Sequence, residues 1–160
     1  GWVNWELDDD GKSLLKFVRR LIKLRQAYPI LRRGRFLVGN YNEEIGVKDV
    51  TWLSPNGSEM SVEQWEDGNG RCLGMLMDGR AQVSGIRRPG QDATLLLVVN
   101  AHHDGVNFTL PKVPEGISWT CLIDTNQPDN HSHGELPFGT EYTITGRSLL
   151  LFELQREEQP

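Results

Sequence analysis

Residues 93–104 have the sequence ATLLLVVNAHHD, and the rest of the chain is best understood from this stretch outward. Its centre, Leu95 to Val99, is an unbroken apolar run that begins after Asp92 and ends before polar residues 100–104. A short run of Leu and Val between such boundaries predicts a β-strand buried on both faces. Because a doubly covered strand lies inside a layered domain, we expect other strands to pack around it.

Short apolar or alternating segments recur between turn residues after residue 47, and they predict about seven strands, mostly antiparallel. The segments are 47–53, 72–77, 95–99, 106–110, 118–123, 141–145 and 148–154. Residues 54–57 (SPNG) predict a turn, and Gly146-Arg147 predicts a tight hairpin between the last two strands. Residues 80–91 and 124–139 are polar and predict loops. This spacing favours an antiparallel β-sandwich, so the predicted fold class is mainly β.

One long amphipathic helix is predicted ahead of the sandwich, over residues 13–28, and a single capped turn is predicted at Ser61 and Gln64. Acidic residues 8–10 favour the N-terminus of the long helix, and Pro29 ends it. Its apolar residues form one broad stripe: Leu14, Phe17, Val18, Leu21, Ile22, Leu24 and Tyr28. The stripe is wide for a helix at the edge of a sheet domain, which predicts a further packing partner.

The composition is that of a globular protein, with 160 residues, a net charge of −5 and 38% hydrophobic residues. No apolar run approaches the roughly 20 residues that span a bilayer, so we expect no membrane partner. Basic residues concentrate in the first third, where they could contact nucleic acid, but the acidic remainder would repel phosphate. We therefore favour a solvated helix face, or one that faces another domain, and predict no nucleic-acid partner.

The cysteines, Cys72 and Cys121, lie in apolar, strand-like surroundings. They could pair if their strands are neighbours, but we favour buried free thiols in a reducing cytoplasm. Two cysteines far apart do not form a zinc site.

Histidines and carboxylates offer weak candidates for a metal or catalytic site. His102 and His103 would point to opposite faces if they continued the strand, so we favour a structural role in a turn. His131 and His133 have better spacing for a metal but lie in a polar loop without an evident third ligand. Asp78 and Asp124, at strand ends, could act as an acid/base pair, although turn and cap roles are more usual. We predict no metal, no cofactor and no catalytic residue.

Three tryptophans, Trp52, Trp65 and Trp119, could stack on sugars, although aromatic residues in a sandwich are more often part of the core. Trp52 and Trp65 are kept as weak candidates for substrate binding. There is no Gly-rich phosphate loop and no nucleophile elbow.

Several segments together resemble bacterial glycogen debranching enzymes, the isoamylase-type members of the α-amylase superfamily. Residues 2–5 (WVNW), 15–25 (LKFVRRLIKLR) and 29–33 (PILRR) resemble the end of the catalytic barrel in that family. The match continues in residues 47–60 (VKDVTWLSPNGSEM) with Trp65, then in 97–103 (LVVNAHH) and 146–149 (GRSL). The resemblance covers most of the chain and is specific in combination, although each piece is weak alone.

The resemblance implies a (β/α)₈ barrel upstream that carries an aspartate nucleophile, a glutamate acid/base and a further aspartate. Nothing in this sequence matches the catalytic motifs of the family, so no catalytic residue is assigned. The implied division is the end of the barrel with its last helix at 1–28, a linker at 29–48, the C-terminal sandwich at 49–154 and a tail at 155–160. Gly1 followed by Trp2 also indicates the interior of a longer protein.

The function implied is that of a non-catalytic C-terminal fragment whose sandwich braces the barrel of a cytoplasmic enzyme. The parent would hydrolyse α-1,6 branch linkages in glycogen or limit dextrin. Two alternatives remain open: a glucan-binding module that uses exposed tryptophans, and a protein-interaction module that self-associates through residues 11–28.

Overall fold

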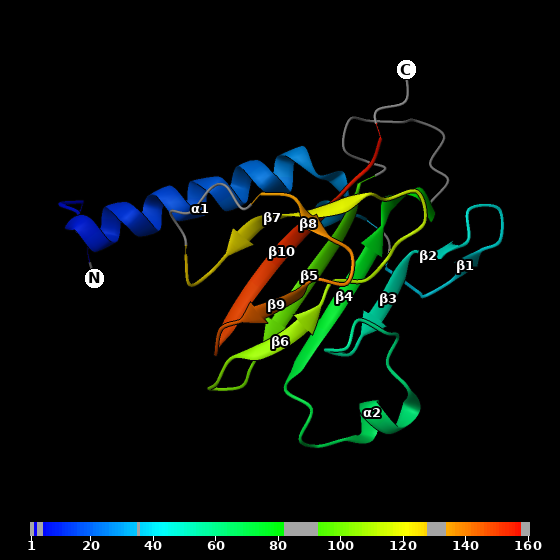
Figure 1. Ribbon diagram of the computed structural model, residues 1–160. Helices are drawn as coiled ribbons and strands as arrows, with labels where there is room; N and C mark the ends of the chain where they lie inside the picture. The colour runs from blue at the N-terminus through cyan, green and yellow to red at the C-terminus, as the bar shows by residue number, and fades with distance from the viewer. Residues whose placement is uncertain (1, 3–4, 35, 82–92, 128–133, 158–160) are drawn as a thin grey trace.

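The computed structural model describes residues 2, 5–34, 36–81, 93–127 and 134–157 (Figure 1). Its centre is a six-stranded antiparallel sheet with the strand order β3-β4-β5-β10-β7-β8. These strands are β3 (Val50–Leu53), β4 (Cys72–Asp78), β5 (Thr94–Asn100), β7 (Ser118–Asp124), β8 (Leu136–Pro137) and β10 (Ser148–Gln155). The apolar run predicted to be central is therefore β5, which pairs with β4 on one side and β10 on the other.

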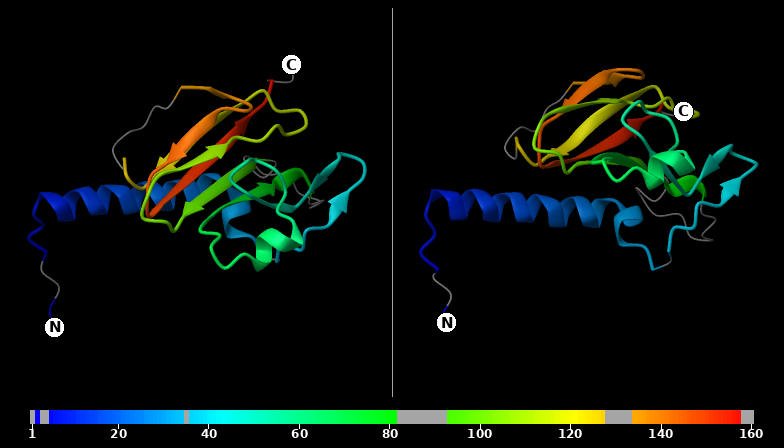
Figure 2. Two further views of the ribbon diagram at one scale, coloured as in Figure 1. Left: turned by 60° about the horizontal axis from the view of Figure 1, so that its bottom comes forward. Right: turned by 90° about the horizontal axis from the view of Figure 1, so that it is seen from below.

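The opposite faces of this sheet are covered by different elements (Figure 2). A two-stranded sheet of β6 (Val106–Thr109) and β9 (Glu141–Ile144) lies over one face, and α1 (Asp9–Ala27) lies along the other. The predicted sandwich is confirmed, with a helix added as a third layer. Strand alternation explains how β5 serves both cores, because Leu96 and Val98 enter the sandwich core while Leu95 faces the helix.

The sandwich core packs the six-stranded sheet against β6 and β9. Its fully buried aromatic residues are Phe108, Trp119 and Phe152, and the Trp119 indole Nε1 donates to the Pro111 carbonyl at 2.8 Å. Gly74 is required here, because a Cβ at this position would lie 2.6 Å from Cζ of Phe108.

The core on the helix side packs α1 and a 3₁₀ helix, η1 (Pro29–Arg32), on the sheet. Buried Leu95, Ile123, Leu151, Met77 and Ile30 form its centre, and Phe17, Leu21, Leu24 and Tyr28 pack against them. A β-bulge leaves Leu122 of β7 without a partner on β10, and the guanidinium of Arg20 donates to the Leu122 carbonyl. The helix is thus joined to the sheet by a polar contact as well as by apolar packing.

The helix begins earlier than predicted and ends where Pro29 requires. Asp8 is the N-cap, and its carboxylate accepts the Gly11 amide at 2.8 Å. The smaller predicted helix is α2 (Val62–Glu66), and the capping box of Ser61 and Gln64 is confirmed.

One predicted hairpin is wrong. β9 pairs with β6, and β10 pairs with β5 and β7, so residues 145–147 carry the chain from one sheet to the other. The Arg147 amide donates to the His102 carbonyl at 2.8 Å, and Arg147 takes a positive φ of 52°. The physical reason is burial, because the apolar sides of the two strands face each other across the core, where Tyr142 and Phe152 make an edge-to-face contact.

Other predicted segments need smaller corrections. The strand predicted at 47–53 is divided at Asp49 into β2 (Val47–Lys48) and β3, and β2 pairs with β1 (Tyr41–Asn42) in a separate small sheet. Asp49 bridges the two sheets: its amide donates to the Asn40 carbonyl, its carbonyl accepts the Asp78 amide, and its carboxylate accepts the amides of Val38 and Gly39. β8 lies inside the predicted loop 124–139, and a short 3₁₀ helix, η2 (Gly79–Ala81), opens the predicted loop 80–91. The remainder of that loop falls outside the described residues.

The domain boundaries stay a prediction. Residues 29–48, expected to be a linker, contain η1, β1 and β2, and Ile30 is buried in the helix-side core.

Candidate functional site

A groove of about 530 Å³ lies between two connections at one end of the large sheet. One wall comes from the β3–β4 connection with α2, and the other comes from the β5–β6 connection. Polar side chains of both connections line it: Ser54, Gln64, Asp67, Asn69, Arg71, His102 and Asp104. Pro55, Met60, Gly70, Cys72, Gly105 and Val106 complete the lining.

Strand pairing brings the two walls together. Cys72 opposes Asn100 at the start of the β4–β5 ladder, and the Ala101 amide donates to the Arg71 carbonyl at 2.8 Å. Asn100 is almost fully buried, and its side-chain Nδ2 lies 2.9 Å from the Asp104 carbonyl and 3.1 Å from the Ile144 carbonyl. The groove is therefore built on buried backbone pairing rather than on freely moving loops.

The α2 wall is fixed by its capping box. The Ser61 amide donates to Oε1 of Gln64 at 2.9 Å, and the Met60 amide donates to the Trp52 carbonyl at 2.9 Å. Asp67, the C-cap, accepts the Asn69 amide at 2.9 Å, which closes the turn after the helix. These bonds hold Gln64, Asp67 and Asn69 in position along the groove.

The two tryptophans proposed as sugar-binding candidates lie together at the surface. Trp52 on β3 and Trp65 on α2 make an edge-to-face contact, with ring centroids 5.6 Å apart and an interplanar angle of 78°. Trp52 is 37% exposed and Trp65 is 52% exposed, so both differ from Trp119, which is fully buried in the core. Trp65 directly follows Gln64 of the groove wall.

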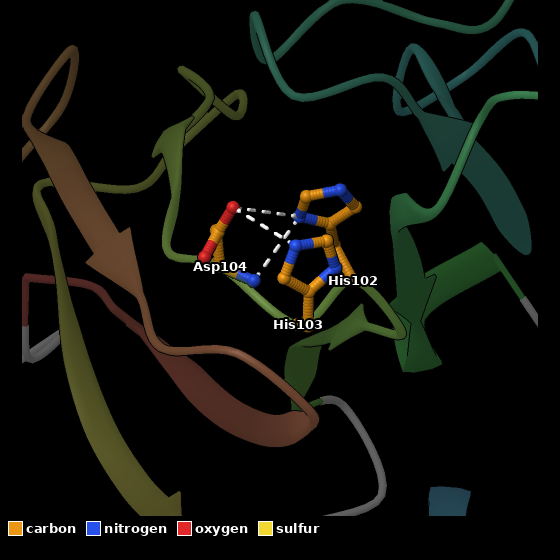
Figure 3. A group of neighbouring side chains, drawn as sticks. All are labelled: His102, His103 and Asp104. Atoms are coloured by element: carbon orange, nitrogen blue, oxygen red, sulfur yellow. Dashed lines mark hydrogen bonds and ion pairs between the residues drawn. The ribbon is translucent and has the colours of Figure 1, made fainter.

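His102, His103 and Asp104 form a compact group on the β5–β6 connection (Figure 3). The two imidazoles do not alternate across a strand, because β5 ends at Asn100 and both residues lie in the turn that the sequence analysis favoured. Their ring centroids are 4.2 Å apart, and Nε2 of His103 lies 3.2 Å from Oδ2 of Asp104. One ligand atom from each residue can lie within 4.8 Å of the others, which is close enough to consider a metal.

The local hydrogen bonding favours a turn over a metal site. Nδ1 of His102 accepts the Asp104 amide at 3.1 Å, and this bond uses the lone pair that a metal would need. His103 and Asp104 are mostly exposed. His131 and His133 lie outside the described residues. The absence of a metal site stays a prediction, and the geometry of this group is explained by its turn.

Asp78 and Asp124 are not brought together. Asp78 on β4 and Asp124 on β7 are separated by β5 and β10 in the sheet. Asp78 forms an ion pair with Arg80 at 2.7 Å, and Oδ1 of Asp124 accepts the Asn126 amide at 2.8 Å. The two carboxylates thus close the turns that follow their strands.

The cysteines are free, as predicted, and the same two strands separate Cys72 from Cys121. Burial raises the pKa of the Cys72 thiol to about 11 and that of Cys121 to about 12. Both thiols are therefore poor nucleophiles near neutral pH.

A second surface of interest is the outer side of α1. Leu14, Val18 and Ile22 recur every fourth residue and are 63%, 40% and 51% exposed. Leu15, beside them, is also exposed. At 3.6 residues per turn, this stripe is centred about 100° around the helix from the stripe that packs on the sheet. The broad apolar face of the sequence is thus two adjacent stripes, of which one is covered; we call the other the outer stripe.

A family model described as "Isoamylase, C-terminal" matches residues 49–153. The chain belongs to this family. The match includes the whole of the groove, Trp52 and Trp65, whereas α1 precedes it. No helix among the described residues is long and apolar enough to cross a bilayer.

Full-length relatives extend the similarity to nearly the whole chain. A glycogen operon protein GlgX homolog of Mycobacterium tuberculosis is 33% identical over 153 residues, which cover 94% of this chain and 21% of that protein. Isoamylase of Pseudomonas amyloderamosa is 26% identical over 94% of this chain and 19% of its own length. Glycogen debranching enzyme of Serratia proteamaculans is 33% identical over 82% of this chain and 16% of its own length. The chain thus spans about a fifth of these relatives.

A solved structure agrees on the fold. Type I pullulanase of Bacillus subtilis, in complex with maltose, superposes with a TM-score of 0.54 at 15% identity, over 95% of this chain and 17% of the pullulanase.

Sequence reasoning missed the groove as a site. Asp67, Asn69 and Arg71 follow the predicted capped turn as an ordinary polar connection, and only the pairing of β4 with β5 brings them opposite His102 and Asp104. The sequence signal that could have indicated the groove was the capping box of Ser61 and Gln64, which fixes its α2 wall.

Proposed function

We propose that this chain is the non-catalytic C-terminal part of a cytoplasmic debranching enzyme. The parent enzyme hydrolyses α-1,6-glucosidic branch linkages in glycogen or limit dextrin, with its catalytic carboxylates in an upstream barrel. Family membership and the names of the relatives support this proposal. The two free cysteines support a reducing compartment.

The exposed outer stripe of α1 supports the proposal that this part of the chain braces the barrel. Leu14, Val18 and Ile22 expose apolar surface on a helix whose adjacent stripe is already covered by the sheet. A contiguous apolar patch of this kind marks an interaction surface. Fully burying one such side chain contributes roughly 1.5–3 kcal/mol, so docking the outer stripe on the barrel would brace the catalytic domain.

The experiment compares two charge substitutions in the full-length parent enzyme. Ile22→Asp places a carboxylate in the outer stripe, and Lys23→Asp places the same residue at the next helical position, which is also exposed. We expect Ile22→Asp to shorten the half-life of debranching activity at elevated temperature at least tenfold. Lys23→Asp should behave like the wild type. Equal half-lives for Ile22→Asp and the wild type would contradict the proposed docking of the outer stripe on the barrel.

Self-association is a second use of the same surface. Two isolated 160-residue chains could bury residues 11–28 against each other, because the outer stripe is exposed in each. Sedimentation equilibrium should then show a dimer in the wild type and a monomer in Ile22→Asp. A monomeric wild type at high concentration would contradict this alternative.

A further inference from the structure

The groove has the chemistry of a site for an uncharged ligand rich in hydroxyl groups. Its side chains include a guanidinium from Arg71, carboxylates from Asp67 and Asp104, and carboxamides from Gln64 and Asn69. Hydroxyl groups both donate and accept, so they can use this mixture, whereas an ion of either sign would meet a like charge. The volume of about 530 Å³ lies within the roughly 300–1,000 Å³ that is usual for small-molecule sites.

Several of these polar groups are available for a ligand. Within the described part of the chain, neither the Arg71 guanidinium nor the Asn69 carboxamide has a hydrogen-bond partner. Gln64 uses only its Oε1 for the capping box, which leaves its NH₂ group to donate. The groove therefore offers donors that are not already committed to the fold.

An exposed aromatic ring lies next to Gln64 in the sequence, outside the lining of the groove. Trp65 follows Gln64 on α2 and is 52% exposed, while its neighbour Trp52 supports it edge-to-face. Such a contact leaves a ring face for stacking, and the apolar C–H face of a pyranose ring fits a flat indole. Together, stacking and uncommitted donors are the features that a sugar site needs.

We propose that Trp65 and the groove bind a segment of linear α-glucan. The choice of an α-glucan rests on the proposed function, because the parent enzyme acts on a branched α-glucan. In this arrangement the segment lies beside α2, one glucose unit stacks on Trp65, and Arg71, Asn69 and Gln64 donate to its hydroxyl groups. The C-terminal domain thereby holds an outer chain of the substrate away from the catalytic centre.

The test is calorimetric titration of the 160-residue chain with maltoheptaose. We expect saturable binding in the millimolar range, and binding at least tenfold weaker in Trp65→Ala and in Arg71→Ala. Trp5→Ala is the matched control, because Trp5 is 85% exposed and precedes α1, so it belongs neither to the groove lining nor to α2. Its affinity should equal that of the wild type. Urea denaturation of each variant checks its folding. If Trp65→Ala is destabilised, the affinity of Arg71→Ala for maltoheptaose decides the test.

Two outcomes would overturn binding at this site: no saturation by maltoheptaose in the wild type, or unchanged affinity in both Trp65→Ala and Arg71→Ala. Cellohexaose, a β-linked glucan, should bind at least tenfold more weakly than maltoheptaose, and equal affinity would contradict selectivity for an α-glucan. The proposed function is tested separately. If the full-length enzyme debranches glycogen while the wild-type chain fails to bind maltoheptaose, only the groove inference falls.

Discussion

Arg80 links the end of β4 to the connection that follows β6. Its Nε and one terminal nitrogen donate to the two oxygens of Asp78 at 3.0 and 2.7 Å, and its other terminal nitrogen donates to Glu115 at 2.6 Å. Asp78 is 2% exposed, so its charge depends on this fork of hydrogen bonds. The hydrogen bonds that Arg80 donates to Asp78 raise the pKa of the Arg80 guanidinium.

Removing Arg80 should be costly because it would leave a buried carboxylate unpaired. We expect Arg80→Met to lower the free energy of unfolding by about 3–5 kcal/mol. Lys48→Met is the control, because it breaks an ion pair with Glu59 that is partly exposed and should cost less than about 1 kcal/mol. Urea denaturation at neutral pH measures both values. Similar losses of unfolding free energy in the two variants would mean that the burial of Asp78 does not determine how much its ion pair contributes to stability.

At the scale of elements, the sequence predicted the features that are determined by residues close together in the chain. The capping box at Ser61, the helix end before Pro29 and the buried run from Leu95 were all visible in the sequence, because each depends on neighbouring residues. The hairpin between β9 and β10 was wrong because two strands joined by a short turn can also lie in facing sheets. Which arrangement forms depends on residues distant in sequence, such as Phe108 and Leu96.

The candidate site was predictable only in part for the same reason. Trp52 and Trp65 were identified by residue type, and the structure places them together. The placement of Arg71 opposite Asp104 depends on the register of β4 against β5, which no local pattern contains. The turn role favoured for His102 and His103 agrees with the structure, but the argument from strand geometry does not apply, because β5 ends at Asn100, whose side chain bonds the backbone of the following loop.

The two stripes of α1 lead to an element-scale prediction. Leu21 packs in the helix-side core, whereas its neighbour Ile22 lies in the outer stripe. Leu21→Ala should lower the free energy of unfolding by about 2–5 kcal/mol because it leaves a cavity. Ile22→Ala should change it by less than about 1 kcal/mol, because much of that side chain is already in water. Urea denaturation of the dilute chain measures both free energies of unfolding. Equal losses in Leu21→Ala and Ile22→Ala would contradict the assignment of the stripes.

At the scale of the whole molecule, α1 is the layer that closes one face of the large sheet (Figure 2). The division implied by the resemblance assigns residues 1–28 to the barrel, yet Phe17, Leu21 and Leu24 pack on Leu95, Leu151 and Ile123. If the outer stripe docks on the barrel as proposed, the helix has the sheet on one stripe and the barrel on the other. Such a helix would transmit a displacement of either domain to the other as a rigid element.

A truncation tests whether the sheet can dispense with this layer. A chain that begins at residue 29 loses the four helix-side apolar residues Phe17, Leu21, Leu24 and Tyr28. These side chains are partly buried, so each contributes less than the roughly 1.5–3 kcal/mol of a fully buried one, yet their sum is still a large part of the stability of a domain, about 5–15 kcal/mol. We expect this chain to bind the dye ANS and to lose its cooperative urea transition. A chain that begins at residue 8 retains the Asp8 cap and should unfold like the full chain. If the chain from residue 29 unfolds at the same urea concentration as the full chain, the helix belongs to the barrel alone.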